Sequence, residues 1–254
     1  MPNDKVNPMK RFSNRVDDYI KSRPSYPEAI ITFMQNELGL IPEDKIADIG
    51  SGTGKLSELL LKNPNMVYCV EPNKEMREAA EKMLKGFPNF ISINGTAENT
   101  GLEPKCIRFI TCAQAFHWFN HEKAKSEFER ILLSDGWVVL IWNSRVIDSS
   151  NFMKDYEKFL LEFSVDYSQV NHKNIGEKIL NNFFSNYRNI IFPYSQIFDF
   201  KGLRSRLLSS SYIPSETNAR YSVMMDGLKD LFEKYEIDGN VEFIYNTEIY
   251  FGRM

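Results

Sequence analysis

Short apolar runs alternate with amphipathic segments along the chain between about residues 45 and 143. Runs rich in Val, Ile and Phe are typical of buried strands, whereas apolar residues spaced three and four apart indicate helices that pack by one face. The pattern predicts five strands, at Lys45–Ile49, Met66–Val70, Phe90–Ile93, Arg108–Ala113 and Trp137–Trp142. Between them it predicts three helices, near Gly54–Lys62, Lys74–Leu84 and His121–Leu132. Strands and helices in this alternation form βαβ units around a parallel sheet.

The chain departs from this alternation at both ends. Before the first strand, Pro27–Leu38 has the apolar spacing of a helix. After the fifth strand, apolar and aromatic residues form two further helical stripes, and a third helix and a last strand follow. These elements are predicted at 152–163, 179–187, 216–235 and Val241–Tyr250.

The predicted elements define an α/β fold. We expect a Rossmann-like, doubly wound and mostly parallel sheet, with an antiparallel last strand and a helical insertion after the fifth strand. Ser134-Asp135-Gly136 predicts a tight turn into the fifth strand. Because ligands of such sheets bind beyond the carboxyl ends of the strands, the residues that follow each strand are the candidates for a site.

Composition narrows the possible partners. The chain has 254 residues, of which 43% are hydrophobic and 26% charged, and its net charge is −3 without a basic cluster, so nucleic-acid binding is not favoured. No apolar run approaches the roughly 20 residues of a membrane helix, and the N-terminus lacks the apolar core of a signal peptide. Three cysteines and three histidines have no metal-ligand spacing. We therefore expect a soluble, cytoplasmic protein without a metal, a membrane or a nucleic acid as partner.

The most informative motif is Asp48-Ile49-Gly50-Ser51-Gly52-Thr53-Gly54, between the first strand and the next helix. Glycines in such a turn let a ligand lie against the backbone, and the turn delivers the amides of a helix N-terminus to it. A P-loop would need Gly at 49 and Ser or Thr at 56, where the chain has Ile49 and Leu56. The dinucleotide pattern would need Gly at 55, which is Lys55.

Polar or uncharged turn residues also follow the next three strands. Glu71 ends the second strand, where a carboxylate can accept hydrogen bonds from both hydroxyls of a ribose. Thr96-Ala97-Glu98 follows the third strand, where a polar group could meet the amine of an adenine and Ala97 would leave room for its ring. Gln114–Phe119 follows the fourth strand and is rich in aromatic residues. His117, within it, is a weak catalytic candidate, because a lone histidine among aromatic residues is more often structural.

Together these residues resemble the class I S-adenosylmethionine-dependent methyltransferases. The resemblance implies that the loop cradles the methionine and sugar of S-adenosylmethionine, with Asp48 as its anchor. It also implies that Met76, on the following helix, faces the adenine. The cofactor-binding residues predicted in this way are Asp48, Gly50, Ser51, Gly52, Thr53, Gly54, Glu71, Pro72, Met76, Thr96, Ala97, Glu98, Gln114 and Ala115.

Two further segments are similar to the small-molecule branch that includes trans-aconitate-methyltransferase-like proteins with a methyltransferase type 11 domain. One is the N-terminal motif around Tyr19 and Arg23, and the other is Gly202–Pro214. Arg23 is a weak candidate for a carboxylate clamp, and Tyr19, four residues before it, for part of a lid. We expect lid helices and a cofactor-binding core at 1–143, a helical insertion acting as substrate cap at 144–190, and C-terminal strands and helices that complete the sheet at 191–254.

The resemblance implies SN2 transfer of a methyl group to a small-molecule acceptor, with a carboxylic acid as one candidate and S-adenosylhomocysteine as the product. No catalytic dyad is visible in the sequence, and the acceptor atom stays open. The alternative is a module that binds S-adenosylmethionine or S-adenosylhomocysteine without catalysis, since it would need the same loop and the same Glu71. We expect a monomer or a homodimer.

Overall fold

The computed structural model describes residues 24–164, 176–210 and 212–254. The predicted lid residues Tyr19 and Arg23 lie outside these ranges. Within the described part of the chain, none of the helices has the length and apolar character needed to cross a membrane.

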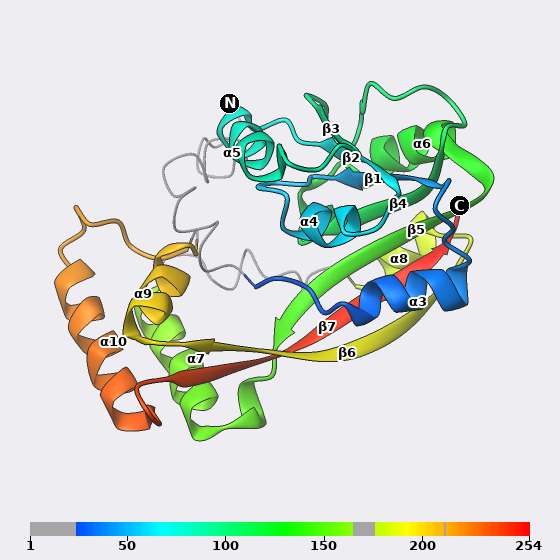
Figure 1. The fold of residues 1–254 in the computed structure, drawn as a ribbon. Helices are drawn as coiled ribbons and strands as arrows, with labels where there is room; N and C mark the ends of the chain where they lie inside the picture. The colour runs from blue at the N-terminus through cyan, green and yellow to red at the C-terminus, as the bar shows by residue number, and fades with distance from the viewer. Residues whose placement is uncertain (1–23, 165–175, 211) are drawn as a thin grey trace.

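A seven-stranded sheet forms the centre of the fold, with the strand order β3-β2-β1-β4-β5-β7-β6 (Figure 1). The first five strands run parallel, which confirms the predicted doubly wound α/β fold. The last two run antiparallel to their neighbours, so the sheet has one more antiparallel strand than the sequence predicted. The strands are β1 (Lys45–Ile49), β2 (Met66–Val70), β3 (Phe90–Ile93), β4 (Ile107–Ala113), β5 (Leu132–Arg145), β6 (Asn186–Phe198) and β7 (Val241–Arg253).

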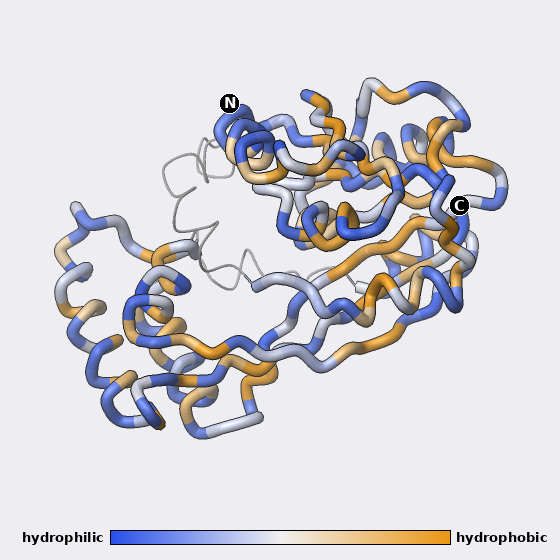
Figure 2. The backbone as a smooth tube through the Cα atoms, in the orientation of Figure 1, coloured by the Kyte–Doolittle hydropathy of each residue, from blue (hydrophilic) through white to orange (hydrophobic). Residues whose placement is uncertain are grey.

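Helices cover both faces of the sheet. Leu60 of α4 and Ile30 of α3 share one buried cluster with Ile46 of β1, whereas Phe128 of α6 shares another with Ala47, the next residue of β1. Because neighbouring strand residues point to opposite faces, β1 needs apolar residues at both positions. Figure 2 shows this apolar character along the central strands, in contrast to the mixed helices. The helices on the sheet are α3 (Ala29–Leu38), α4 (Lys55–Leu61), α5 (Lys74–Leu84), α6 (His121–Ile131) and α8 (Glu177–Phe183).

A third buried cluster lies at the far end of the β6–β7 ribbon (Figure 1). We call its three helices the helical lobe: α7 (Asn151–Phe163), α9 (Phe200–Leu208) and α10 (Tyr221–Tyr235). The residues expected to form the insertion, 144–190, supply α7 to this lobe and α8 to the face of the sheet that α6 covers. The proposed domain boundaries stay a prediction.

Strand β6 was not predicted, and the helical stripe at 179–187 was wrong at its end. Helix α8 stops at Phe183, and Tyr187 already belongs to β6. The strand lies at the edge of the sheet, which tolerates Pro193 within it. Ile191 and Ile197 are exposed there, so the apolar and polar positions do not alternate in the way that would have indicated a strand.

The predicted turn at Ser134-Asp135-Gly136 lies inside β5. Leu132 pairs with Ile107 and Trp137 with Phe109, so residues 133–136 bulge out between the two pairs. A β-carbon on Gly136 would stand 2.5 Å from Leu132 Cγ. The glycine therefore allows a bulge rather than ending a strand.

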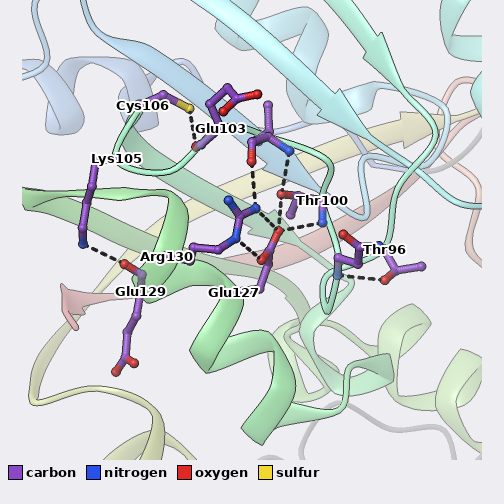
Figure 3. A network of polar contacts seen from close by, with 10 residues as sticks. Thr96, Thr100, Glu103, Lys105, Cys106, Glu127, Glu129 and Arg130 are labelled. Carbon is purple, nitrogen blue, oxygen red and sulfur yellow. Dashed lines mark hydrogen bonds and ion pairs between the residues drawn. The ribbon is translucent and has the colours of Figure 1, made fainter.

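A buried carboxylate fixes the loop between β3 and β4 to α6 (Figure 3). Glu127 of α6 accepts hydrogen bonds from the backbone amide and the hydroxyl of Thr100. Arg130 pairs with the same carboxylate at 2.7 Å and also donates to the carbonyl of Leu102. These contacts hold the segment around Thr100 and Leu102, which follows β3, against α6.

We expect Glu127→Ala to lower the free energy of unfolding by about 2–4 kcal/mol, because two buried donors of Thr100 lose their acceptor. The measurement is urea denaturation followed by circular dichroism. Glu129→Ala is the matched control, since this exposed side chain lies on the same helix, and it should change stability by less than about 0.5 kcal/mol. Equal stability of the two variants would contradict this account.

Candidate functional site

The glycine loop connects β1 to α4 in a conformation that side chains rarely adopt. Gly50 and Gly54 have φ angles of +68° and +81°. A β-carbon on Gly50 would lie 2.6 Å from Cβ of Ala115, and one on Gly54 would lie 2.7 Å from Leu84 Cδ1. Glycine is therefore required at both positions, by backbone angle and by space. The loop is thereby packed directly against the end of β4.

Asp48 anchors the start of the loop to the neighbouring helix and strand. Its carboxylate is buried and accepts hydrogen bonds from Ser57 Oγ of α4 at 2.6 Å and from Thr111 Oγ1 of β4 at 3.1 Å. Burial raises the pKa of Asp48 to about 6, although the two hydroxyl hydrogen bonds oppose this shift. One side chain thus joins β1, α4 and β4 at the point where the loop begins.

Glu71, at the end of β2, holds the loop from the side. Its carboxylate oxygens accept hydrogen bonds from the amides of Gly52 at 2.9 Å and Asn73 at 2.8 Å. Burial raises the pKa of Glu71, and these two backbone hydrogen bonds oppose the shift. Each oxygen of a carboxylate can accept more than one hydrogen bond, so the group can still receive ribose hydroxyls.

Pro72 and Met76 follow Glu71 around the same corner. Asn73, which the sequence analysis did not single out, caps α5 by accepting a hydrogen bond from the amide of Met76. Met76 is buried, and its sulfur lies 3.9 Å from the position of a β-carbon on Gly52. The structure therefore brings Met76 against the loop, and its predicted position facing the adenine stays a prediction.

The turn after β3 is built by local hydrogen bonds. Thr96 and Asn99 exchange backbone hydrogen bonds, and Ala97 is buried between them. The carboxylate of Glu98 accepts a hydrogen bond from the amide of Asn120 at 2.8 Å, which ties this turn to the start of α6. Glu98 thus has a structural partner next to its predicted adenine-binding role, which stays a prediction.

The end of β4 is strained. Gln114 has a φ angle of +57°, a left-handed conformation that non-glycine residues seldom adopt. The backbone amide of Gln114 donates to the carbonyl of Ile141 at 2.9 Å, and this hydrogen bond holds Gln114 in place. Strained residues of this kind concentrate at ligand sites, where the surrounding structure maintains them. His117 lies just beyond, in the short helix η3 (Phe116–Trp118), with its ring 4.7 Å from that of Trp118.

Two hydroxyl groups of the loop have no hydrogen-bond partner among the described residues. They are Ser51 Oγ and Thr53 Oγ1, and both atoms are buried. A buried hydroxyl without a partner is costly, so natural proteins rarely keep one without a reason. A ligand with polar groups that lies in the loop would supply the hydrogen-bond partners. S-adenosylmethionine has such groups, so the loop residues fit this cofactor.

The structure thus gathers the predicted residues at one edge of the sheet, at the ends of four adjacent strands. The groups that hold these residues were not indicated by any sequence pattern. Ser57 and Thr111 bind Asp48, and the Phe119 ring lies 3.3 Å from a β-carbon position on Gly50. Thr111 and Phe119 reach the loop only through the fold, so no local pattern could have indicated them.

The buried Asp48 makes stability depend on pH in a defined direction. Because its folded pKa lies above the ordinary value of 3.8, the wild-type protein loses stability as the pH rises from about 4 through 6. Asn at this position cannot ionise. We expect the free energy of unfolding of Asp48→Asn, relative to wild type, to increase by about 2–3 kcal/mol between pH 4 and pH 7. Urea titrations at four pH values measure this difference, and a difference that does not change with pH would overturn the assignment.

Comparisons with known proteins agree with the geometry. Residues 47–140 match a methyltransferase domain family. The chain is 27% identical over 243 residues to an uncharacterized methyltransferase-like protein of Schizosaccharomyces pombe, an alignment that covers 94% of this chain and 93% of that protein. A second, uncharacterized methyltransferase of the same organism is 32% identical over 137 residues, or 54% of this chain and 53% of that protein.

A solved structure has a similar fold. It is a putative type II methyltransferase from Anaeromyxobacter dehalogenans, with a TM-score of 0.69, 16% sequence identity, and coverage of 91% of this chain and 97% of that one. The strand order, the matched domain and the full-length relative lead to one conclusion. The chain is similar to class I S-adenosylmethionine-dependent methyltransferases, and this similarity supports S-adenosylmethionine as its cofactor.

Proposed function

We propose that the protein transfers the methyl group of S-adenosylmethionine to a small-molecule acceptor, with a carboxylic acid as the favoured class. One observation carries the proposal: a glycine loop with two unpartnered buried hydroxyls lies beside a buried carboxylate that can accept further hydrogen bonds. A net charge of −3 argues against a nucleic acid as acceptor.

The proposed roles of the site residues follow from their positions. Glu71 accepts the ribose hydroxyls, and Ser51 and Thr53 gain polar partners from the bound cofactor. Met76 and the turn Thr96–Glu98 face the adenine, while Gln114 and Ala115 lie beside the methionine part. Asp48 and the loop glycines shape the cradle without touching the reacting atoms.

The chemistry asks little of the protein beyond alignment and exclusion of water. The cofactor supplies an activated methyl group on a sulfonium, and the acceptor attacks it in line. A carboxylate acceptor needs no general base, which agrees with a site in which we assign none. His117 is therefore not given a catalytic role.

We propose that the helical lobe, together with the segment 144–190, forms the part of the protein that selects the acceptor. Helix α7 from that segment packs with α9 and α10 at the end of the β6–β7 ribbon. Strand β5 leads from the end of the cofactor cradle to this lobe. We propose a monomer or a homodimer as the working form.

Thr53→Val tests whether the loop hydroxyls await a ligand. The substitution keeps the shape of the side chain and removes a buried hydroxyl without a partner. We expect the ligand-free variant to gain about 1 kcal/mol of stability and to bind S-adenosylhomocysteine less tightly than wild type. Thermal unfolding with and without S-adenosylhomocysteine measures both effects. A loss of stability in the ligand-free variant would show that the hydroxyl serves the fold itself.

Calorimetric titration tests the function. We expect S-adenosylmethionine and S-adenosylhomocysteine to bind with micromolar affinity, about −8 kcal/mol, and NAD not to bind. Glu71→Ala should weaken both ligands by about ten- to a hundredfold, because hydrogen bonds to an ionised group are lost. Glu78→Ala, an exposed glutamate on the next helix, is the control and should bind as wild type does. Unchanged affinity in Glu71→Ala would refute the ribose assignment.

A methyl-transfer assay then tests catalysis. The protein is incubated with methyl-labelled S-adenosylmethionine and a panel of small carboxylic acids. Transfer of label to an acid supports the enzyme. Tight binding of S-adenosylhomocysteine with no transfer to acids, amines or alcohols would instead favour the alternative, a cofactor-binding module without catalysis.

A further inference from the structure

The helical lobe contains a buried arginine without a carboxylate partner. Arg206, on α9, is 4% exposed. Its Nε donates to the Tyr245 hydroxyl at 3.3 Å, and its Nη1 donates to the hydroxyls of Ser209 and Ser210 at 3.5 and 3.2 Å. None of these hydrogen bonds uses Nη2. Among the described residues, no carboxylate forms an ion pair with this guanidinium.

Two acidic residues of the lobe pair with cations other than Arg206. Glu157 pairs with Arg145 at 2.9 Å, so this pair adds no net charge near Arg206. Asp155 pairs with Lys158 and Lys234, each at 2.9 Å. The positive charge of Arg206 therefore stays uncompensated within the described part of the lobe.

Such an arrangement is costly for a merely structural residue. A buried charge without a counter-charge destabilises a fold by several kcal/mol unless other groups compensate it. Hydroxyls surround Arg206, because Tyr156 and Tyr245 are buried beside it and Tyr212 is near. The Ser209 hydroxyl already donates to the carbonyl of Arg206. The Tyr245 hydroxyl accepts from the guanidinium and can also donate to an anion, so it suits a site that an anion enters.

The β5–β7 pairing connects this arginine to the cofactor edge. Arg145 pairs with Tyr245, the residue that binds Arg206, and Ile141 of the same strand lies beside the end of β4. Arg145 lies four positions after Ile141, or about 13 Å along the strand at roughly 3.3 Å per residue. Arg206 therefore lies beyond the cofactor cradle along β5, in the helical lobe that we propose selects the acceptor.

We propose that Arg206 is a specificity-determining residue that binds an anionic group, a carboxylate or a phosphate, of the methyl acceptor. The proposal rests on the proposed function, because it assigns the anion to the acceptor. The Nη2 group and the Tyr245 hydroxyl hold the anion, and the planar guanidinium favours an oxyanion with two oxygens in one plane. The bound group orients the acceptor toward the sulfonium methyl.

The test measures anion binding directly. Sodium glutarate and inorganic phosphate are titrated into the full-length protein by calorimetry, with and without S-adenosylhomocysteine, against sodium chloride at matched ionic strength. We expect saturable binding of at least one of the two anions to wild type. Arg206→Met should weaken that binding by about ten- to a hundredfold, as expected for a lost charge-assisted hydrogen bond. Stronger glutarate binding indicates a carboxylate acceptor, and stronger phosphate binding a phosphorylated one.

Matched variants separate binding from folding. Arg204→Met removes an exposed arginine of the same helix and should bind both anions as wild type does. Arg206→Lys keeps the charge without the planar fork, and we expect it to bind the anion more weakly than wild type and more tightly than Arg206→Met. Because Met removes an uncompensated buried charge, Arg206→Met should unfold at a temperature no lower than wild type in the absence of anions.

Several results would overturn the proposal. One is wild-type protein that binds S-adenosylhomocysteine but neither anion, and another is Arg206→Met that binds the anion as wild type does. A large drop in the unfolding temperature of ligand-free Arg206→Met, together with unchanged anion stabilisation in Arg206→Lys, would assign the residue a structural role. If wild type bound no S-adenosylhomocysteine, the proposed function would fail instead, while the anion titration of the ligand-free protein would still decide the role of Arg206.

Discussion

The carboxylate of Asp48 accepts hydrogen bonds from two different elements, and the shape of the glycine loop depends on it. Ser57 belongs to the helix that follows the loop, and Thr111 to the strand beside it. The first strand, the helix and β4 are therefore held together at the point where the chain turns. Because the anchor is buried, solvent does not weaken these hydrogen bonds, but the carboxylate is correspondingly costly to ionise.

Costly features collect at this one edge of the sheet. The left-handed Gln114, the unpartnered hydroxyls of Ser51 and Thr53, and the buried carboxylates of Asp48 and Glu71 all lie at the ends of adjacent strands. The apolar clusters on the two faces of the sheet stabilise the scaffold that maintains them. A preorganised binding site needs such energetically unfavourable groups to be held in a rigid frame, because the ligand then gains contacts without rearranging the fold.

The sequence predicted the cofactor half of the molecule well because its signals are local. Strands β1, β2 and β3 have the predicted bounds, since each is a short apolar run between clear turns. Glycine spacing and Glu71 are also readable along the chain. The groups that support them, such as Thr111 and Phe119, are far from the loop in sequence and come to it only through the strand order. The edge strand β6, with Pro193 and exposed isoleucines, carries too mixed a pattern to be predicted.

Arg206 shows the limit of prediction from pattern most directly. An arginine in a sequence indicates a surface position, and the segment Phe200–Leu208, with Lys201, Gly202 and Arg204 in it, has a weak helical pattern. Arg206 is buried because α9 packs against Tyr245 of β7, an element that lies far from α9 in the sequence. The sheet and the helical lobe thus have different proposed roles. The sheet edge presents the candidate cofactor cradle, and the lobe carries Arg206, the charged group that we propose distinguishes one acceptor from another.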